Sequence, residues 1–300
     1  MAGINEGRVV IVTGAGRGIG REHALAYAAT GAKVVVNDLG GDTTGEGADL
    51  SPAQQTVADI QAMGAEAVVN GENVADFEGA GRLVQQAIDR FGRLDVVVNN
   101  AGILRDRMLV NMAENEWDAV IGVHLKGTFG PTRHAAEYWR EQSKAGNPVD
   151  ARIVNTSSPS GLFGNAGQTN YGAAKAGIAA FTVICALELG RYGVTANAIA
   201  PVARTRMTED LGIGAKPEEG QFDALDPANI SPLVVWLGSP ESKDVTGRVF
   251  LVDGDRISVA EGWRRGPTAS NDGDRWDPTT LGAVVPGLVA QAQPNSTMLS

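Results

Sequence analysis

The stretch VVIVTGAGRGIGREHALAYAATGAKVVVND, from Val9 to Asp38, decides the fold of this chain. It begins with a run of β-branched residues, typical of a buried strand, which ends at Thr13 in a cluster of glycines. A helical pattern follows over 19–30 and ends at Gly31, a residue type common just after helix C-termini. A second apolar run, 33–38, ends in an acidic residue. The stretch therefore predicts a β-α-β unit with a glycine-rich turn between its first strand and its helix.

The same alternation of strand and helix continues along the chain. Further apolar runs predict strands at 65–70, 94–99, 152–157, 194–200 and 248–252. Helical patterns lie between them at 51–64, 76–91, 114–140, 170–192 and 227–237. Apolar strands that alternate with helices are typical of a parallel sheet covered on both faces. We therefore expect an α/β fold with a doubly wound sheet.

Two segments depart from this alternation. The glycine-rich stretch GGDTTGEGAD, residues 40–49, is long for a connection that usually has about 2–6 residues. The residues after 265 are interrupted by Gly, Pro, Asn and Asp, with no apolar helical pattern before 281–289. In 300 residues we expect one domain over 1–265, followed by an irregular extension over 266–300.

Composition narrows the possible partners. The net charge of −10 and the pI of about 4.8 make this chain a poor candidate for binding a nucleic-acid backbone. Its single cysteine, Cys185, excludes an internal disulfide, and its three histidines lack a metal-ligand spacing with carboxylates. No apolar run of membrane-spanning length and no leader or lipidation signal stands out. We expect a cytoplasmic protein without a nucleic-acid partner, a membrane partner or a metal.

The glycine cluster predicts a dinucleotide site. Gly14, Gly16, Gly18 and Gly20 let the chain turn sharply, so that backbone N–H groups and a helix N-terminus can approach a pyrophosphate. Asp38, at the end of the next strand, can bind both ribose hydroxyls of NAD and repel the 2′-phosphate of NADP. Arg17 in the same turn favours NADP instead, because a guanidinium attracts that phosphate. The carboxylate stands at the 2′ position itself, so we expect NAD, with NADP as the alternative.

Tyr171 and Lys175 form a candidate acid/base pair. They are four residues apart at the start of a predicted helix and so share one face. A nearby ammonium favours the phenolate and lowers the pKa of a tyrosine from about 10. Such a pair suits the interconversion of an alcohol and a ketone. Ser158 follows a predicted strand at the sheet edge where doubly wound folds bind ligands, and its hydroxyl can hold the substrate oxygen.

Together with N-N-A-G at 99–102 and P-x₃-T at 201–205, these motifs resemble those of the short-chain dehydrogenase/reductases, over about 7–265. The resemblance implies a Rossmann-type fold with a mostly seven-stranded parallel sheet, and a homodimer or homotetramer. It makes Tyr171 the proton donor and acceptor and Ser158 a contact of the substrate oxygen, and Lys175 also binds the nicotinamide ribose. The cofactor residues that it implies are Gly14, Gly16, Arg17, Gly18, Ile19, Gly20, Asp38, Asn73, Val74, Asn100, Ala101, Gly102, Tyr171, Lys175, Pro201 and Thr205.

Two positions depart from the family pattern. His124 stands where the family often has an asparagine that supports a proton-relay water, and Val202 stands where a glycine usually follows Pro201. A histidine can also carry protons, so His124 is a candidate catalytic residue, with a packed structural histidine as the alternative.

Further motifs indicate the substrate. VVVNDLGGD at 34–42, GILRDRM at 102–108 and the run through Trp263 are similar to the (3R)-hydroxyacyl-CoA dehydrogenase domains of the peroxisomal multifunctional enzyme type 2 group. The resemblance implies NAD-dependent oxidation of a (3R)-3-hydroxyacyl-CoA in fatty-acid or steroid side-chain degradation. An NADPH-linked 3-oxoacyl reductase, a 17β-hydroxysteroid dehydrogenase and a non-catalytic dinucleotide sensor are the alternatives. The small-molecule partner is thus an acyl-CoA thioester or a steroid.

Candidate substrate contacts follow from this expectation. The phosphates of coenzyme A require basic side chains nearby, and the candidates near the expected sheet edge are Arg105, Arg107, Arg204 and Arg206. The alternative is that these are ordinary solvated arginines. The connection 208–227 lies where the family covers its substrate, and the apolar residues expected to line it, or simply to pack there, are Met207, Leu211, Ile213 and Phe222.

Overall fold

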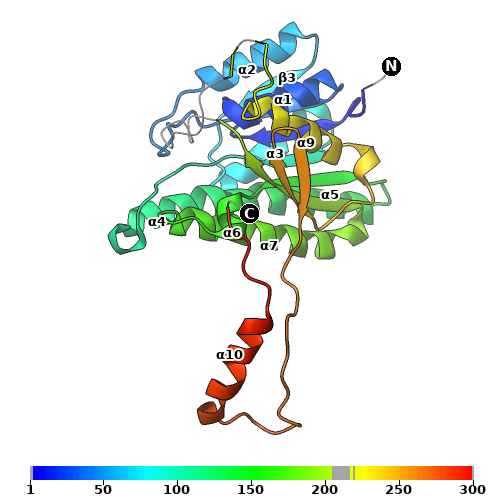
Figure 1. The fold of residues 1–300 in the computed structure, drawn as a ribbon. Helices are drawn as coiled ribbons and strands as arrows, with labels where there is room; N and C mark the ends of the chain where they lie inside the picture. The colour runs from blue at the N-terminus through cyan, green and yellow to red at the C-terminus, as the bar shows by residue number, and fades with distance from the viewer. Residues whose placement is uncertain (1–2, 205–216, 219, 299–300) are drawn as a thin grey trace. The chain divides into compact units, whose positions relative to one another are not determined.

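The computed structural model describes residues 3–204, 217–218 and 220–298. The chain falls into two units, Met1–Ala260 and Glu261–Ser300. The first holds a sheet covered by helices (Figure 1). The second contains the helix α10, Leu281–Gln291, preceded by a short 3₁₀ turn at Pro278–Thr280. The expected division after residue 265 stays a prediction.

The sheet of the first unit has eight strands in the order β3-β2-β1-β4-β5-β6-β7-β8. Their bounds are β1 Val9–Thr13, β2 Lys33–Asn37, β3 Ala67–Asn70, β4 Val96–Asn99, β5 Ala151–Thr156, β6 Val194–Val202, β7 Val249–Asp253 and β8 Arg256–Ala260. The pairings from β3 through β7 are all parallel. The predicted mostly seven-stranded parallel sheet is therefore confirmed.

The eighth strand was not predicted. β8 pairs antiparallel with β7, and the pairing of Asp253 with Arg256 leaves a tight turn that begins at Gly254, with φ +58°. A glycine at that place is a known hairpin signal. The residues of β8 are largely exposed, so their pattern lacks the apolar run by which the other strands were recognised.

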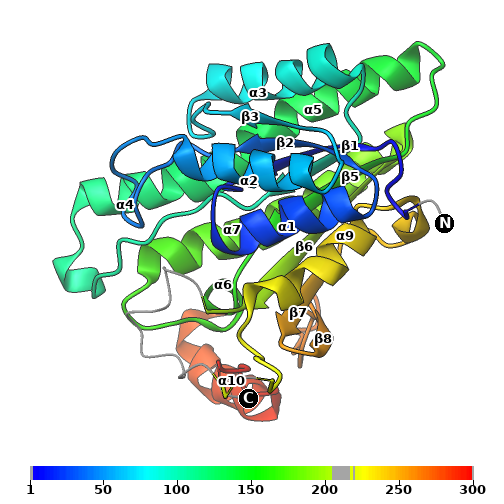
Figure 2. The same ribbon diagram turned by 90° about the horizontal axis from the view of Figure 1, so that it is seen from above.

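Helices cover both faces of the sheet (Figure 2). Their bounds are α1 Gly18–Ala29, α2 Ser51–Ala62, α3 Phe77–Phe91, α4 Glu114–Ile121, α5 Gly127–Lys144, α6 Pro159–Phe163, α7 Thr169–Leu189 and α9 Ser231–Leu237. Successive side chains of a strand point to opposite faces. Val10 and Val12 accordingly belong to a core with α1, α2 and α9, whereas Val9 and Ile11 belong to a second core with α3, α5 and α7. This arrangement confirms the doubly wound α/β fold.

The predicted helix over 114–140 is present and runs to Lys144, but it is not α-helical throughout. α4 ends at Ile121, a π-helical turn occupies Gly122–Lys126, and α5 then continues to Lys144. A π turn adds one residue and shifts the register of those after it by one position, which the average periodicity of a long helix does not reveal. Such turns are frequent at functional sites, and this one carries His124.

α7 also corrects an expectation. With the following turn to Tyr192 it is, within the described residues, the one helix long and apolar enough to cross a membrane by length and composition. It contacts β5 and β6 and buries Ala174, Ile178 and Cys185, as core helices of α/β proteins do. The apolar character of α7 is thus partly explained by its place against the sheet.

Candidate active site

The turn between β1 and α1 forms an open anion cradle. Gly14 has φ +64°, and a Cβ on Gly20 would lie 2.2 Å from the Gly14 carbonyl oxygen and 2.4 Å from Asn100 Nδ2. Only glycine fits this close approach. The first turn of α1 has no side-chain cap, so its N–H groups remain available to a phosphate. The backbone therefore fits the pyrophosphate of a dinucleotide.

Neighbouring side chains brace the cradle. Asn100 Nδ2 donates to the carbonyl oxygens of Thr13 and Gly14, at 3.0 and 3.2 Å. Thr13 Oγ1 accepts from the backbone N–H groups of Asn100 and Ala101. Asn100 was predicted from its motif, whereas the bracing role of Thr13 was not. The threonine at the end of β1 was nevertheless visible as the first letter of the glycine motif.

Asp38 is held at the predicted ribose position. Its two carboxylate oxygens accept from the N–H groups of Gly16 and Gly40, at 2.8 and 2.7 Å. A Cβ on Gly16 would lie 2.8 Å from Asp38 Oδ2, so the carboxylate stands directly against the glycine turn. Arg17 lies close enough to Asp49 to add to the hydrogen bonds with Ser51 that lower the pKa of Asp49. A carboxylate in this place, as a hydrogen-bond acceptor, fits the two free ribose hydroxyls of a dinucleotide.

The predicted adenine side is built on a buried amide chain. Asn37 Nδ2 donates to Asn70 Oδ1 at 2.7 Å, and Asn70 Nδ2 donates to Gln86 Oε1 at 2.7 Å. Val74 is buried, and Asn73 beside it accepts from the N–H of Ala75. Asn73 and Val74 were named from the sequence. The amide chain was not, because its members come from three separate elements.

The structure brings Ser158, Tyr171 and Lys175 together at the carboxyl edge of the sheet. Ser158 follows β5 and caps α6, and it hydrogen bonds to Tyr171. Tyr171 and Lys175 lie on consecutive turns of α7, with Lys175 Nζ 5.5 Å from the centre of the Tyr171 ring. Lys175 Nζ also donates to the Thr156 carbonyl oxygen at 2.6 Å. The tyrosine hydroxyl thus has a hydroxyl partner and a nearby amine.

The protonation of the pair is governed by burial. Desolvation raises the pKa of Tyr171, the hydrogen bond with Ser158 lowers it, and the negative charge of Asp106 raises it further. Desolvation also lowers the pKa of Lys175 to about 7. The sequence led us to expect a lowered tyrosine pKa, but in this protein burial outweighs the favourable interactions. Near neutrality Tyr171 is therefore a protonated phenol, and Lys175 is close to its own titration point.

His124 lies beside this pair. Its ring meets that of Tyr171 edge to face, with 5.1 Å between ring centres. Nε2 is 2.8 Å from the Ile103 carbonyl oxygen, and burial lowers the pKa of His124 to about 3. A Cβ on Gly102 would lie 2.4 Å from His124 Cε1, so the glycine of N-N-A-G makes room for the imidazole. Nε2 also lies 3.1 Å from the Ile103 backbone nitrogen, so the tautomer decides whether Nε2 donates to the Ile103 carbonyl oxygen or accepts from the Ile103 N–H. Nδ1 has no hydrogen-bond partner in the described part of the chain.

Comparisons with known proteins agree with this geometry. The family model for short chain dehydrogenases matches residues 8–214. The chain is 46% identical over 299 residues to the Mycobacterium tuberculosis hydroxyacyl-CoA dehydrogenase ChsB1, covering 97% of this chain and 91% of that protein. This chain belongs to the short-chain dehydrogenase family. It is consequently an oxidoreductase that uses NAD(P) and interconverts a secondary alcohol and a ketone.

Two further relatives of this short-chain dehydrogenase extend the comparison. The mouse peroxisomal multifunctional enzyme type 2 is 44% identical over 280 residues, which are 93% of this chain and 34% of that longer protein. A crystal structure of a short chain dehydrogenase from Mycobacterium avium is 58% identical and has a TM-score of 0.89. The match covers 98% of this chain and 99% of that one.

The glycine-rich segment 40–49 crosses the site of this short-chain dehydrogenase. It leaves β2, and its Thr43 and Thr44 carbonyl oxygens accept from the Leu104 N–H and from Arg105 Nε, at 3.0 and 2.9 Å. Residues 104 and 105 follow β4, and β1 lies between β2 and β4 in the sheet. The segment therefore passes the carboxyl end of β1, where the cradle lies. The sequence showed its unusual length but not where it docks.

The candidate arginines that the structure describes are engaged by carboxylates. Arg105 is bound by residues 44 and 46, and its distance to Glu46 is 3.5 Å. Arg107 pairs with Glu116 at 3.1 Å, and Arg204 pairs with Asp223 at 2.6 Å. They do not form a ready-made basic patch for phosphates.

The remaining predicted residues lie at the end of β6 and in the segment that follows it. Pro201 and Val202 end β6 at the carboxyl edge. Phe222 is exposed. The remaining predictions in this region fall outside the described residues: Thr205, Arg206, Met207, Leu211 and Ile213.

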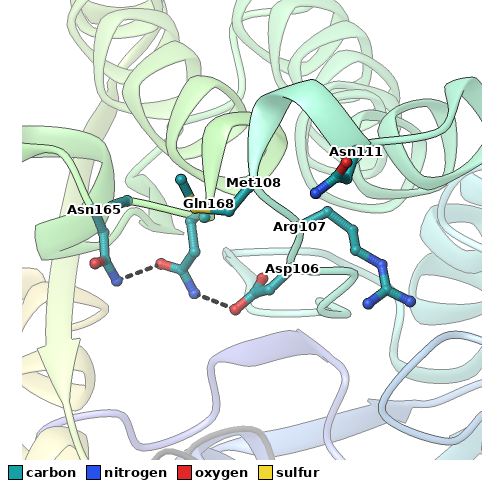
Figure 3. Close-up of a pocket in the computed structure, with 8 residues that line it drawn as sticks. Asp106, Arg107, Met108, Asn111, Asn165 and Gln168 are labelled. Carbon is teal, nitrogen blue, oxygen red and sulfur yellow. Dashed lines mark hydrogen bonds between the residues drawn. The ribbon is translucent and has the colours of Figure 1, made fainter.

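A cavity of about 710 Å³ opens between the loop after β4 and the loop before α7 (Figure 3). It was not predicted as a unit, because its two walls are far apart in the sequence. Its lining residues are Asp106, Arg107, Met108, Asn111, Asn165, Ala166, Gly167 and Gln168. Gln168 precedes the first turn of α7, which carries Tyr171, so one wall of the cavity lies next to the start of that helix.

Proposed function

We propose that this protein oxidises a (3R)-3-hydroxyacyl-CoA to the 3-oxoacyl-CoA with NAD. The observation that carries the chemistry is the Tyr171 hydroxyl hydrogen bonded to Ser158, with Lys175 Nζ 5.5 Å from the centre of the Tyr171 ring, at the edge that also carries the dinucleotide cradle. Similarity over 97% of the chain to a protein named as a hydroxyacyl-CoA dehydrogenase supports the substrate class.

In this reaction the chain's own residues bind and move the proton. Ser158 Oγ holds the substrate alcohol oxygen against Tyr171, and Tyr171, once it has lost its own proton, takes the hydroxyl proton as the carbonyl forms. Bound NAD would supply the acceptor for the hydride that leaves the carbon bearing this hydroxyl. A titrating lysine beside the phenol assists the proton's departure, because its ammonium favours the phenolate that must form.

His124 acts in this proposal as a positioning residue. Its Nε2 hydrogen bond fixes Ile103, and the residues just after Ile103 bind both the glycine-rich segment and α7. A neutral, buried imidazole cannot supply a proton near neutrality, so the hydrogen bond to Ile103 is its contribution.

The preference for NAD is supported by Asp38. A carboxylate fixed between Gly16 and Gly40 would bring its negative charge to the 2′ position of the adenosine ribose. We expect Asp38→Ala to weaken NAD binding and to strengthen NADP binding, as measured by quenching of protein fluorescence. An unchanged ratio of the two affinities would assign the choice to another residue, with Arg17 as the first to test.

Absorbance of reduced nicotinamide tests the proposed reaction. The panel contains short and long (3R)- and (3S)-3-hydroxyacyl-CoAs and a 17β-hydroxysteroid, each with NAD and with NADP. Reduction of NAD with (3R) thioesters is the expected result, and turnover of the steroid alone would overturn the substrate class. Tyr171→Phe should lose activity by about 10²-fold or more while it still binds NAD.

A second function, reduction of a 3-oxoacyl thioester with NADPH, is favoured by one observation. Burial raises the pKa of Tyr171, and a protonated phenol is a proton donor, as ketone reduction requires. Rates in both directions at one pH, with each cofactor, separate the two functions.

We also propose that the enzyme works as a homodimer or homotetramer. Apolar side chains on the outer surfaces of α5 and α7 support this, since Phe129, Val183, Ile184 and Leu187 are exposed in the single chain. Light scattering coupled to size-exclusion chromatography measures the mass directly, and a monomer at micromolar concentration would contradict the proposal.

A further inference from the structure

Asp106 sits at the junction of two loops that border the candidate active site. Its Oδ2 accepts from Gln168 Nε2 at 2.7 Å, and Gln168 Oε1 accepts from Asn165 Nδ2 at 2.9 Å (Figure 3). The backbone joins the same loops, because the Arg107 N–H donates to the Gly167 carbonyl oxygen at 2.9 Å. A chain of two side-chain hydrogen bonds, together with one backbone hydrogen bond, thus connects the loop after β4 to the loop before α7.

This fastening fixes where α7 begins. Gln168 is the residue just before α7, and its carbonyl oxygen accepts from the Gly172 N–H at 2.7 Å in the first turn. Asn170, fully buried, donates from Nδ2 to the Arg105 carbonyl oxygen at 3.0 Å. Tyr171 lies between Asn170 and Gly172, the two residues through which these contacts hold the first turn. The place of its hydroxyl therefore depends on contacts made by residues 105–107.

The Asp106 carboxylate is also an uncompensated charge. Its second oxygen, Oδ1, is buried and has no hydrogen-bond partner within the described residues. The flanking arginines are turned to other carboxylates, Arg105 to Glu46 and Arg107 to Glu116. Asp106 as a residue is half-buried, but around its buried Oδ1 the local dielectric is lower than in water, so an unpaired charge there is screened less than an exposed one.

Three groups from the surrounding elements contact Tyr171, and the charge of a fourth, Asp106, acts on it without a contact. Ser158 comes from the start of α6, Lys175 from α7 itself, His124 from the π turn and Asp106 from the loop after β4. His124 is neutral, and Lys175 is near its titration point. Asp106 is therefore the one group of the four that carries a negative charge, and burial raises the pKa of its carboxyl above the usual value, against the opposing effect of the Gln168 hydrogen bond.

We propose that Asp106 is a positioning residue for Tyr171: through Gln168 it holds the first turn of α7, and its negative charge, carried on the loop fastened to that turn, opposes ionisation of the Tyr171 hydroxyl. This inference rests on the proposed role of Tyr171. Its consequence is that the enzyme needs a higher pH to form the phenolate than Ser158 and Lys175 alone would require. The direction agrees with the effect of Asp106 on the pKa of Tyr171, which it raises.

Three variants separate the charge from the hydrogen bond. Asp106→Asn keeps an acceptor for Gln168 and removes the charge, whereas Asp106→Ala removes both. Asp118→Asn is the matched control, because it removes an exposed carboxylate from α4 in the same region. The titration of Tyr171 is followed by phenolate absorbance, as the difference between each variant and the same variant carrying Tyr171→Phe.

We expect the phenolate to form at lower pH in Asp106→Asn than in the wild type, and at an unchanged pH in Asp118→Asn. In the oxidation assay the acid limb of kcat/KM moves in the same direction, so Asp106→Asn gains most at low pH. Asp106→Ala should show the same titration shift together with a roughly tenfold lower kcat, because the hold on α7 is lost.

An unchanged phenolate titration in Asp106→Asn overturns the charge role, and equal kcat in the Asn and Ala variants overturns the positioning role. The absorbance measurement needs no turnover, so it stands even if the proposed substrate is wrong. Loss of the Tyr171 role itself would appear separately, as full activity in Tyr171→Phe.

Discussion

The two edges of the sheet bury charged groups in opposite ways. At the amino edge, Arg152 is 1% exposed and donates to the Ser239 carbonyl oxygen, to Ser242 Oγ and to the Ala151 carbonyl oxygen. Asp150 pairs with it and also accepts from Arg8 at 3.0 Å. Apart from Arg8 Nε, the nitrogens of these two arginines all have partners.

At the carboxyl edge the buried polar groups have incomplete hydrogen bonding. Lys175 is 3% exposed and has one hydrogen bond, to the Thr156 carbonyl oxygen, while His124 Nδ1 and Asp106 Oδ1 have no partner within the described residues.

Unpartnered buried atoms also occur at the amino edge, at Asn5 Oδ1, Arg8 Nε and Thr195 Oγ1, but none of these groups titrates near neutrality. At the carboxyl edge the incomplete groups include titratable ones gathered around Tyr171, so there the loss of stability accompanies reactive side chains. The buried charged groups of the amino edge stabilise the fold, whereas those of the carboxyl edge reduce stability and serve the reaction.

The sharpest test of this contrast is Lys175→Met. We expect activity to fall by about 10²–10⁴-fold, because the amine beside Tyr171 is lost. We expect the free energy of unfolding near pH 7 to rise by about 1 kcal/mol, since an incompletely paired buried amine is replaced by an apolar chain of similar length. Steady-state rates and urea unfolding measure the two effects on one preparation. A less stable Lys175→Met protein would contradict the contrast.

Arg152→Met should behave in the opposite way. It leaves Ser239, Ser242 and the half-exposed Asp150 without their guanidinium, which should cost about 3 kcal/mol and lower Tm by roughly 6–12 °C. Rates measured well below Tm should match the wild type, because no contact of Arg152 reaches the carboxyl edge. A variant with normal Tm but reduced kcat would show that the amino edge takes part in catalysis.

The pH dependence of stability sharpens the same comparison. The pKa of Lys175 is about 7 when folded, against 10.5 for an unperturbed lysine. Between these values the unfolded chain binds more protons than the folded one, so wild-type stability rises with pH by up to about 1.4 kcal/mol per unit from this group. The advantage of Lys175→Met is therefore largest below pH 7, and it falls and changes sign as the pH rises towards 10.5. Urea unfolding of both proteins at four or five pH values gives this difference, and a constant difference would refute it.

The sequence predicted the carboxyl edge well where its residues are close along the chain. Gly14, Gly20, Tyr171 and Lys175 each lie within one turn or one loop, so their spacing already determines that they act together. Asp38 was predictable as well, because it ends the second strand of the same β-α-β unit.

The rest depended on contacts between distant segments. Asp106 and Gln168 are 62 residues apart, and the glycine-rich segment docks on Arg105 from 61 residues away. The π turn at His124 leaves no mark on the apolar pattern. Local periodicity does not encode such pairings. The amino-edge cluster of Arg8, Asp150 and Arg152 was not predicted for the same reason.

The smallest expected effect concerns His124, which sits at the reactive edge but resembles the structural groups of the other edge. Its folded pKa of about 3 keeps it neutral across the working range, and its contact with Ile103 is one that an asparagine amide can also make. We expect His124→Asn to keep kcat within about threefold and to leave the pH profile unchanged, whereas His124→Ala loses about tenfold with the hydrogen bond. If His124→Asn instead lowered kcat about a hundredfold, the free Nδ1 would have to carry a proton, because that atom is what the asparagine cannot replace.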